Sequence, residues 1–327
     1  MFVSPTVAGN AVLIGSCAGT LYALDRAEGT PLWSYDTRAD GAAAQFHGEP
    51  LLLGKRAIIP TDADPKGHLY AFDTASGVLQ WKLAFDGGVA TTPMLVDGRV
   101  IVVAKTGDVV AVEPDRGAIL WRQRLGDVST WSPAAAGKRV FVAEKTNDVV
   151  ALDAATGAVL WRAPVGARPN TALVVIGKTL VVGTQDGDLH WLALDSGAAK
   201  KRVALGAMPY GTPIYASPLL YVLTANGTLL ALDAESGAVR WKQETPREWT
   251  TYRPLVTGAT IVAGTEEKTL CAFDRTSGES RWCRDVGQVP RGLGAGGDGT
   301  LYVGSLSGVV QAFRFDAAHE LTGTAPR

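Results

Sequence analysis

The sequence has little cysteine, no long apolar run and almost no net charge, and each absence excludes a class of protein. Three cysteines in 327 residues are too few for a disulfide framework. The 31 Lys and Arg residues balance 32 Asp and Glu residues, so the chain lacks the basic signature of a nucleic-acid-binding protein. Its longest apolar runs are about five residues, as in 172–176, whereas a membrane-spanning helix needs about 20. The N-terminal segment has neither a basic nor an apolar region, so we expect that a signal peptide is absent or already removed.

The sequence is rich in apolar residues, at 46%, and contains 38 Gly and nine Trp. Only 19% of the residues are charged, against about 25% in an average soluble domain. The chain is therefore too apolar to be disordered and long enough to bury a large core. A length of 327 residues alone favours two domains of about 150 residues each, but an internal repeat leads to a different conclusion.

One phrase recurs along the chain, with the consensus L-Y-A-L-D-x-x-x-G-x-x-x-W. It is found at 21–33, 69–81, 109–121, 149–161, 229–241 and 270–282. Its tryptophans are separated by 48, 40, 40, 80 and 41 residues. The step of 80 conceals a degenerate unit, in which Gly197 keeps the register while Ala193 and Lys201 replace Asp and Trp. A final unit at 308–314 has Arg314 at the Asp position, so the period of about 40 residues predicts eight units.

Each repeated residue has a structural explanation. The Asp can accept hydrogen bonds from backbone N–H groups inside a tight turn, and the Gly supplies the positive φ that closes the turn. The Trp follows the Gly by four residues on the outgoing strand, where its large ring is suited to packing between neighbouring sheets. We therefore assign a structural rather than a catalytic role to Asp25, Gly29, Trp33, Asp73, Gly77, Trp81, Gly117, Trp121, Asp153, Gly157, Trp161, Asp233, Gly237, Trp241, Asp274, Gly278 and Trp282.

Prolines recur upstream of the phrase and mark the first strand of each unit, because the first residue of a strand need not donate to the ladder. They are Pro5, Pro50, Pro93, Pro133, Pro213 and Pro254. Each unit then holds four short strands and no helical pattern, which predicts an all-β fold, an eight-bladed β-propeller of four-stranded antiparallel blades. We expect a single domain, 1–327, with approximate blades at 1–45, 46–88, 89–127, 128–167, 168–207, 208–247, 248–287 and 288–327.

The phrase A-x-D-x-x-T/S-G-x-x-x-W resembles the tryptophan-docking motif of the pyrroloquinoline-quinone-like propeller repeats. Its clearest copies are AFDTASGVLQW, ALDAATGAVLW, ALDAESGAVRW and AFDRTSGESRW, and the resemblance covers nearly the whole chain. At this length the chain is most similar to the BamB-like propellers of bacteria, which are eight-bladed, non-enzymatic and present loops to partner proteins. The resemblance implies a monomeric scaffold, periplasmic or associated with the outer membrane, that binds a β-barrel assembly component or another envelope protein.

Two other functions stay open within this family: a quinone-dependent dehydrogenase, and a sensor or interaction propeller of a larger protein such as a kinase. The dehydrogenases are much longer and generally carry a disulfide between adjacent cysteines, a calcium site and a catalytic Asp, whereas Cys17, Cys271 and Cys283 are not adjacent. The four histidines lack metal-site spacing. Asp62 and Asp64 lie in an insertion that we interpret as a polar turn rather than a calcium site. We therefore expect no enzymatic activity, no cofactor and no bound metal.

Cys271 and Cys283 fall on consecutive predicted strands of the seventh unit, nearly symmetric about its turn. A cross-strand disulfide and a pair of free thiols are both compatible with this placement. A disulfide would favour an oxidising compartment.

A propeller is expected to bind partners where its repeats stop resembling one another, in the loop that leads into the first strand of each unit. These loops share one end of the ring, because each joins an outermost strand to the next innermost strand, and they are rich in Trp, Tyr and Arg, the types enriched at interface hot spots. The alternative is that these side chains only line or plug the narrow channel. Our hypothesis is a protein-binding face centred on Trp131, Trp249, Tyr252 and Arg253. Its proposed members are Phe46, His47, Trp131, Arg168, Tyr210, Trp249, Tyr252, Arg253 and Arg291.

The last unit is less complete than the others, since Ala318 and Thr322 stand where Gly and Trp are expected. Either 319–322 forms a weak fourth strand, or an upstream piece of a longer protein supplies it. Residues 2–5 already correspond to a first strand, which is compatible with a truncated start. An unfinished blade would expose an unpaired edge, at which a partner strand could add.

Overall fold

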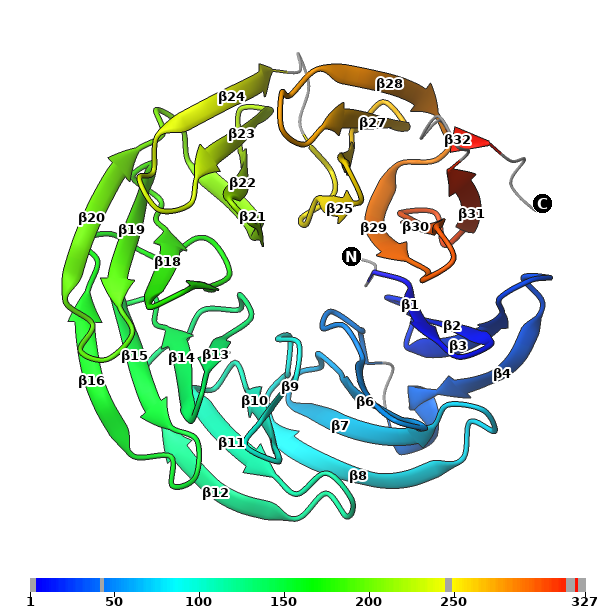
Figure 1. The fold of residues 1–327 in the computed structure, drawn as a ribbon. Coiled ribbons are helices and arrows are strands. Elements are labelled where there is room, and N and C mark those ends of the chain that lie inside the picture. The colour runs from blue at the N-terminus through cyan, green and yellow to red at the C-terminus, as the bar shows by residue number, and fades with distance from the viewer. Residues whose placement is uncertain (1–3, 42–43, 245–248, 316–320, 323–327) are drawn as a thin grey trace.

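The computed structural model is a ring of eight four-stranded sheets, or blades (Figure 1). It describes residues 4–41, 44–244, 249–315 and 321–322. In each sheet the strands follow chain order from the ring axis outward, and neighbouring strands are antiparallel. The prediction of an all-β, eight-bladed propeller is confirmed.

The innermost strand of each blade lies nearest the ring axis, and the outermost strand forms the rim (Figure 1). The innermost strands are β1 (Thr6–Ala8), β5 (Leu51–Leu53), β9 (Met94–Val96), β13 (Ala134–Ala136), β17 (Val174–Ile176), β21 (Pro209–Ala216), β25 (Leu255–Thr257) and β29 (Pro290–Ala295). The outermost strands are β4 (Pro31–Asp36), β8 (Leu79–Asp86), β12 (Ile119–Arg124), β16 (Val159–Pro164), β20 (Ala199–Ala204), β24 (Val239–Glu244), β28 (Ser280–Asp285) and β32 (Leu321–Thr322).

Two buried strands lie between them in every blade. The second strands are β2 (Ala11–Gly15), β6 (Arg56–Pro60), β10 (Arg99–Val103), β14 (Arg139–Ala143), β18 (Thr179–Gly183), β22 (Leu219–Thr224), β26 (Thr260–Gly264) and β30 (Thr300–Ser305). The third strands are β3 (Thr20–Asp25), β7 (Lys66–Asp73), β11 (Asp108–Val112), β15 (Asp148–Asp153), β19 (Asp188–Ala193), β23 (Thr228–Asp233), β27 (Thr269–Asp274) and β31 (Val310–Phe315). A short 3-10 helix, η1 (Thr37–Asp40), follows β4, and no helix in the described part of the chain is long and apolar enough to span a membrane.

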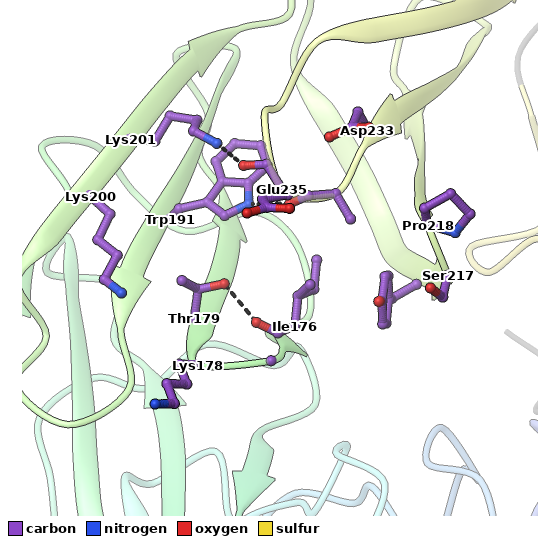
Figure 2. Close-up of a pocket in the computed structure, with 13 residues that line it drawn as sticks. Ile176, Lys178, Thr179, Trp191, Lys200, Lys201, Ser217, Pro218, Asp233 and Glu235 are labelled. Atoms are coloured by element: carbon purple, nitrogen blue, oxygen red, sulfur yellow. Dashed lines mark hydrogen bonds between the residues drawn. The ribbon is translucent and has the colours of Figure 1, made fainter.

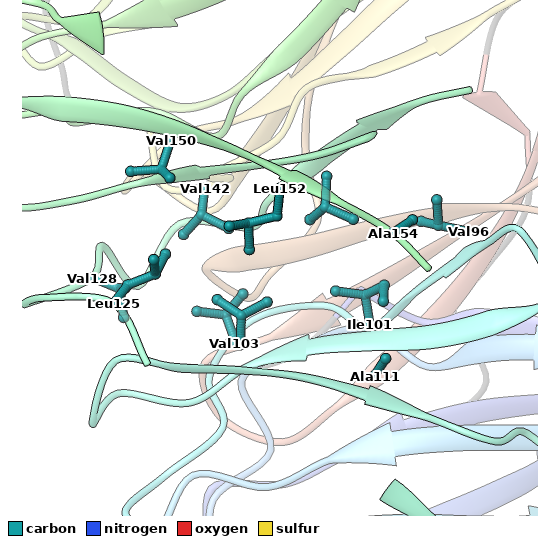
Figure 3. Close-up of a cluster of buried hydrophobic side chains, with 12 residues drawn as sticks. Val96, Ile101, Val103, Ala111, Leu125, Val128, Val142, Val150, Leu152 and Ala154 are labelled. Atoms are coloured by element: carbon teal, nitrogen blue, oxygen red, sulfur yellow. The ribbon is translucent and has the colours of Figure 1, made fainter. Parts of the chain in front are cut away.

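The hydrophobic core lies between neighbouring blades. Between blades 3 and 4, Ile101 and Val103 on β10 pack with Val142 on β14 and with Val150 and Leu152 on β15 (Figure 3). Each of these side chains is at most 2% exposed. Because a neighbouring blade covers each face of an inner strand, the strand reads as a continuous apolar run rather than as an alternating pattern.

The turn between the third and fourth strands has the chemistry that its sequence indicates. In blade 4, the Asp153 carboxylate accepts hydrogen bonds from the N–H groups of Ala155 and Thr156, at 3.0 and 2.9 Å. The hydroxyl and the N–H of Thr156, together with the Ala155 N–H, lower the pKa of Asp153. Gly157 has a φ of 74°, and a Cβ at this position would lie only 2.6 Å from the Trp121 ring. Glycine is therefore required both for the turn and for the close approach of the preceding blade.

The docking tryptophans of blades 1–4 and 6 connect each of these blades to the next one. The Trp121 Nε1 donates a hydrogen bond to the carbonyl oxygen of Ala154 at 2.9 Å. The same contact, at 3.0–3.1 Å, joins Trp33 to Thr74, Trp81 to Pro114, Trp161 to Leu194 and Trp241 to Arg275. Directly across the sheet from these tryptophans, the third strand has a small residue that leaves room for the ring, namely Ala111, Ala23, Ala71, Ala151 and Ala231.

Blade 5 makes the same indole-to-carbonyl hydrogen bond, but its tryptophan lies on the third strand instead of the fourth. Its cross-strand pair is Trp191 on β19 and Lys201 on β20. The Trp191 Nε1 donates to the carbonyl oxygen of Ala234 at 3.0 Å, which is the equivalent carbonyl of blade 6. Trp191 is 2% exposed, and the Lys201 ammonium lies 5.1 Å from its ring centroid. The unit that is degenerate in sequence therefore keeps its hydrogen bond to the next blade.

Blade 8 ends in β32, a two-residue strand that pairs with Arg314 and Phe315. Of the two alternatives for this blade, a weak fourth strand within 319–322 is the one observed. Ala318, the residue at the expected Gly position, lies outside the described residues, as do residues 2–3.

The ring closes where blade 8 meets blade 1. The Arg26 Nε donates to the Tyr302 hydroxyl at 3.1 Å, and the guanidinium also pairs with Asp298. A Cβ on Gly294 would lie 1.9 Å from the Pro5 carbonyl oxygen, so β29 and the segment before β1 are in tight contact. These contacts join the beginning and the end of the described chain.

A disulfide joins Cys271 on β27 to Cys283 on β28, with an S–S distance of 2.03 Å. The two residues are directly opposed in the sheet, and their Cα atoms are 4.1 Å apart. Cys17 is not part of this disulfide. The structure thus resolves the choice between a bond and two free thiols in favour of the bond, which fixes the rim strand of blade 7.

We expect Trp191→Ala to destabilise the protein by about 3 kcal/mol, as much as Trp161→Ala, because each change leaves a cavity between blades and an unpaired carbonyl. Lys201→Ala should cost less than about 1 kcal/mol, since it removes only a partly exposed side chain. Urea unfolding of the three variants measures these differences. Similar small losses for Trp191→Ala and Lys201→Ala would show that Trp191 is not a docking ring.

Alkylation of the unfolded protein without reductant should modify Cys17 alone, whereas prior reduction should expose all three cysteines. The mass of the intact protein reports the number of adducts. A Cys17→Ser variant is the control and should take no adduct until it is reduced. Modification of every cysteine without reductant would contradict the disulfide.

Candidate functional site

A cavity of about 690 Å³ opens around the ring axis on the face that carries the inter-blade loops, which join each outermost strand to the next innermost strand. We call this cavity the funnel. All eight blades contribute to its lining, as shown by Ser4, Glu49, Thr92, Trp131, Leu173, Tyr210, Tyr252 and Arg291. Loops between second and third strands open on the same face, because adjacent strands are antiparallel.

Three aromatic rings from blades 4, 6 and 7 meet in the funnel, and we call them the aromatic trio. Tyr210 and Tyr252 have ring centroids 5.0 Å apart, and Trp131 lies 6.2 Å from Tyr210 and 6.5 Å from Tyr252. The backbone holds the trio together, since the Thr212 N–H donates to the Tyr252 carbonyl at 2.7 Å. Gly211 permits this approach, because a Cβ there would lie 2.0 Å from the same oxygen. The rings are therefore preorganised and remain partly exposed.

An ion pair joins blade 7 to blade 2 at the funnel. The Arg253 Nη1 lies 2.8 Å from the Glu49 Oε2, although the two residues are 204 positions apart in the chain. The Glu49 N–H donates to the Thr92 hydroxyl at 3.1 Å, and the Thr92 N–H donates to the Ser132 hydroxyl at 3.2 Å. Consecutive loops of blades 2, 3 and 4 are thereby linked by hydrogen bonds around the funnel.

Asp62 is the centre of a second charged cluster in the funnel. Its carboxylate lies 2.8 Å from the His47 Nδ1 and pairs with the Lys105 ammonium. The side chain of Asp62 is 9% exposed. Burial opposes its ionisation, but the hydrogen bonds from His47 and Lys105 outweigh burial and lower the pKa of Asp62. The carboxylate is thus held ionised between two cationic or hydrogen-bonding groups.

Six of the nine residues proposed for the face line the funnel, and three do not. The six are His47, Trp131, Tyr210, Tyr252, Arg253 and Arg291. Arg168 is exposed and lies outside the lining.

The structure corrects the placement of Phe46 and Trp249, which lie in the core. Phe46 has no exposed surface and packs so closely on Gly15 that a Cβ there would lie 2.3 Å from its own Cβ. Trp249 is 5% exposed and makes an edge contact with Phe273 at 6.3 Å. Both side chains turn into an inter-blade core, so neither is available to a partner.

Sequence reasoning missed Glu49, Asp62 and Lys105 as residues of the funnel. Asp62 and Lys105 come from loops between second and third strands, whereas the prediction considered only the inter-blade loops. The signal was available, because an antiparallel blade places both kinds of loop on one face. Asp62 was interpreted as part of a polar turn, but its carboxylate is buried and paired.

A separate acidic cluster in blade 5 consists of Asp186, Asp188 and His190, whose ligand atoms lie within 4.8 Å of one another. Arg202 pairs with both aspartates, at 3.6 Å from Asp186 and more closely with Asp188. Burial lowers the pKa of His190, and its Nε2 lies 3.1 Å from the Thr184 hydroxyl. Because the guanidinium already compensates the carboxylates, we interpret this cluster as a structural ion pair.

A family model described as outer membrane protein assembly factor BamB matches residues 2–64, 61–112, 105–203 and 199–317. The chain belongs to this BamB-like family. Its repeats of about 40 residues are therefore those of the family's propeller. No curated protein matches the sequence.

Solved structures show the same fold at low sequence identity. BamB from Moraxella catarrhalis is 18% identical, with a TM-score of 0.78, over 97% of this chain and 95% of that chain. The computationally designed Ika8 protein is 14% identical, with a TM-score of 0.80, over 95% of both chains. The dihydro-heme d1 dehydrogenase NirN is 16% identical, with a TM-score of 0.80, over 97% of this chain and 73% of that chain. The fold thus occurs in an assembly factor and in an enzyme, and it does not decide between them.

The funnel does not fit a pyrroloquinoline quinone with its calcium ion. A calcium ion takes about six to eight oxygen ligands, among which carboxylates supply the negative charge. The two carboxylates of the funnel are already paired, Glu49 with Arg253 and Asp62 with Lys105 and His47. The disulfide of Cys271 and Cys283 lies in blade 7 between β27 and the rim strand β28.

Asp62→Asn should lower the free energy of unfolding by about 2 kcal/mol at pH 7, because it removes the charge that His47 and Lys105 stabilise. A carboxyl with a lowered folded-state pKa stabilises the fold above its unfolded pKa of about 3.9, and this contribution is lost as the pH falls through the folded value. The difference between wild type and variant should therefore shrink below about pH 4. Urea unfolding across the pH range measures it, with Asp64→Asn in the same loop as the exposed control. A difference that does not change with pH would contradict the role of the charge.

Proposed function

We propose that the protein is a non-catalytic scaffold of the cell envelope that binds a partner protein through the funnel, in outer-membrane-protein assembly or another envelope complex. The observation that carries this proposal is the aromatic trio of Trp131, Tyr210 and Tyr252, with Arg253 and Arg291 beside it. Tyr, Trp and Arg are the residues that contribute most binding energy at protein interfaces.

The shape of the funnel supports binding of a projecting segment rather than of a flat surface. A cavity of about 690 Å³ that is lined from all eight blades accepts a loop or a short peptide. The trio is held by ring contacts and by the Thr212–Tyr252 hydrogen bond, so little side-chain freedom is lost on binding.

The charges of the funnel support binding over catalysis. A general acid or base needs a pKa near the working pH. Burial opposes ionisation of Asp62, but the hydrogen bonds that it accepts from His47 and Lys105 lower its pKa, away from that range. Glu49 is held in its ion pair with Arg253. These groups suit specific recognition and orientation of a partner.

The proposed location is the periplasm or the inner face of the outer membrane. The family description supports an envelope role. The disulfide between Cys271 and Cys283 adds an independent argument, because disulfides persist in oxidising compartments such as the periplasm.

The double variant Trp131→Ala/Tyr252→Ala should lose function without unfolding, since both side chains are partly exposed. In a strain that lacks the gene, the wild type should restore the amount of outer-membrane proteins, and the double variant should restore several-fold less. Tyr22→Ala removes a tyrosine that is 38% exposed outside the funnel, and this control should behave as wild type.

A photo-reactive phenylalanine at position 210 should cross-link to the partner, which mass spectrometry then identifies. The proposal fails if the double variant restores outer-membrane proteins fully and position 210 forms no cross-link to an envelope protein.

A further inference from the structure

A second cavity, of about 620 Å³, lies between blades 5 and 6 (Figure 2). It is bordered by the turns that join first to second strands, at 176–179 and 215–218, and by the turn at 233–235 that joins β23 to β24. These turns are at the opposite ends of the strands from the inter-blade loops. The cavity therefore opens on the face opposite the funnel, and we call it the Lys201 pocket.

The pocket lies at the junction where the cross-strand pair of blade 5 has its tryptophan on the third strand instead of the fourth. Where the pair is intact, the ring of Trp161 lies against Gly197, and a Cβ on that glycine would be 2.6 Å from the ring. At the matching Gly237, the nearest atoms belong to Val203 and Lys201, and only the far edge of Trp191 reaches within 3.4 Å. The indole has moved inward to β19, and a lysine stem replaces it on the outer strand. The space that an aromatic ring fills against Gly77, Gly117, Gly157, Gly197 and Gly278 is only partly filled here.

The walls of the pocket combine apolar and polar groups. Ile176 and Pro218 border it, together with the stem of Lys201 and the ring of Tyr215, which is 39% exposed. The exposed tyrosine ring and the aliphatic stem of the lysine are surfaces of this pocket on which a second aromatic side chain can pack.

The lining of the pocket carries three lysines and two carboxylates, those of Asp233 and Glu235. Lys178, Lys200 and Lys201 lie on the blade 5 side, opposite Ser217 and Pro218 (Figure 2). The Lys201 ammonium is engaged, because it donates to the Glu235 carbonyl.

Lys178 and Lys200 carry ammonium groups that form no ion pair within the described residues. The carboxylate of Asp233 does not neutralise them, since it accepts hydrogen bonds from the N–H and hydroxyl of Ser236, each at 2.8 Å, and pairs with Arg240 at 2.7 Å. Two unpaired ammonium groups at the edge of the pocket are complementary to a carboxylate.

We propose that the Lys201 pocket binds an acidic–aromatic peptide segment of a partner protein. The aromatic side chain packs between Tyr215 and the Lys201 stem, and a neighbouring carboxylate pairs with Lys178 and Lys200. This site is separate from the funnel, so the protein has two binding surfaces on opposite faces of the ring.

The test uses the whole protein and the fluorescein-labelled peptide GSEFESG, whose binding is followed by fluorescence polarisation. The peptides GSEAESG, without the aromatic ring, and GSKFKSG, with reversed charge, should bind about tenfold or more weakly, because each loses one of the two proposed contacts. Equal binding of all three peptides, or no binding of GSEFESG, overturns the proposal.

Two variants test the site itself. Lys178→Ala/Lys200→Ala removes the free charges, and Trp191→Ala/Lys201→Trp restores the docking pair of the other blades and so fills the pocket. Each should weaken binding of GSEFESG about tenfold. The proposal is overturned if both variants bind the peptide as wild type does.

Lys138→Ala is the matched control. Lys138 follows Gly137 in blade 4 as Lys178 follows Gly177 in blade 5, but the junction between blades 4 and 5 is filled by the docking tryptophan Trp161. Its affinity for GSEFESG should equal that of wild type. Tyr252→Ala separates this proposal from the funnel. A loss of binding in Tyr252→Ala, with none in the pocket variants, would place the peptide in the funnel and overturn the Lys201 pocket.

Discussion

The architecture depends on one contact, the hydrogen bond from an indole N–H to a backbone carbonyl of the following blade. An isolated four-stranded blade of about 40 residues cannot bury both of its faces. The indole covers part of one face and satisfies a carbonyl of the next sheet, as Trp121 does with Ala154. Asp153 shapes the turn that the ring packs on, and Gly157 makes room for it. The motif therefore connects a blade to the next one, and its repetition along the chain produces the ring.

The features that repeat could be predicted from the sequence. The period of about 40 residues predicts eight blades. The Asp and Gly positions predict the turn between the third and fourth strands, and the Trp positions predict the contact between neighbouring blades. Most of the funnel could also be predicted, because strand order alone places all inter-blade loops on one face. Trp131, Tyr210, Tyr252 and Arg253 lie there.

The features that depend on a single side-chain direction could not be predicted. Phe46 is buried whereas the adjacent His47 lines the funnel, and the residue types alone do not tell which of two neighbouring loop residues faces the core. Trp249 turns into the core in the same way. The repeat places the docking tryptophan on the fourth strand, where blade 5 has Lys201. In blade 5 the tryptophan is instead Trp191, on the third strand directly opposite Lys201, and it donates to the carbonyl oxygen of Ala234 from there. The linear repeat does not show this exchange, because it compares residues only by their position along the chain.

The ion pair between Arg253 and Glu49 has a consequence for the order of folding. The docking hydrogen bonds join residues 33–43 positions apart, so they can form as successive blades are completed. Arg253 and Glu49 are separated by 204 positions and meet only after the intervening blades have curved into an arc. Contacts of such long sequence separation are slow to form. The pair therefore reports on the late stage at which an open array of blades becomes a closed ring.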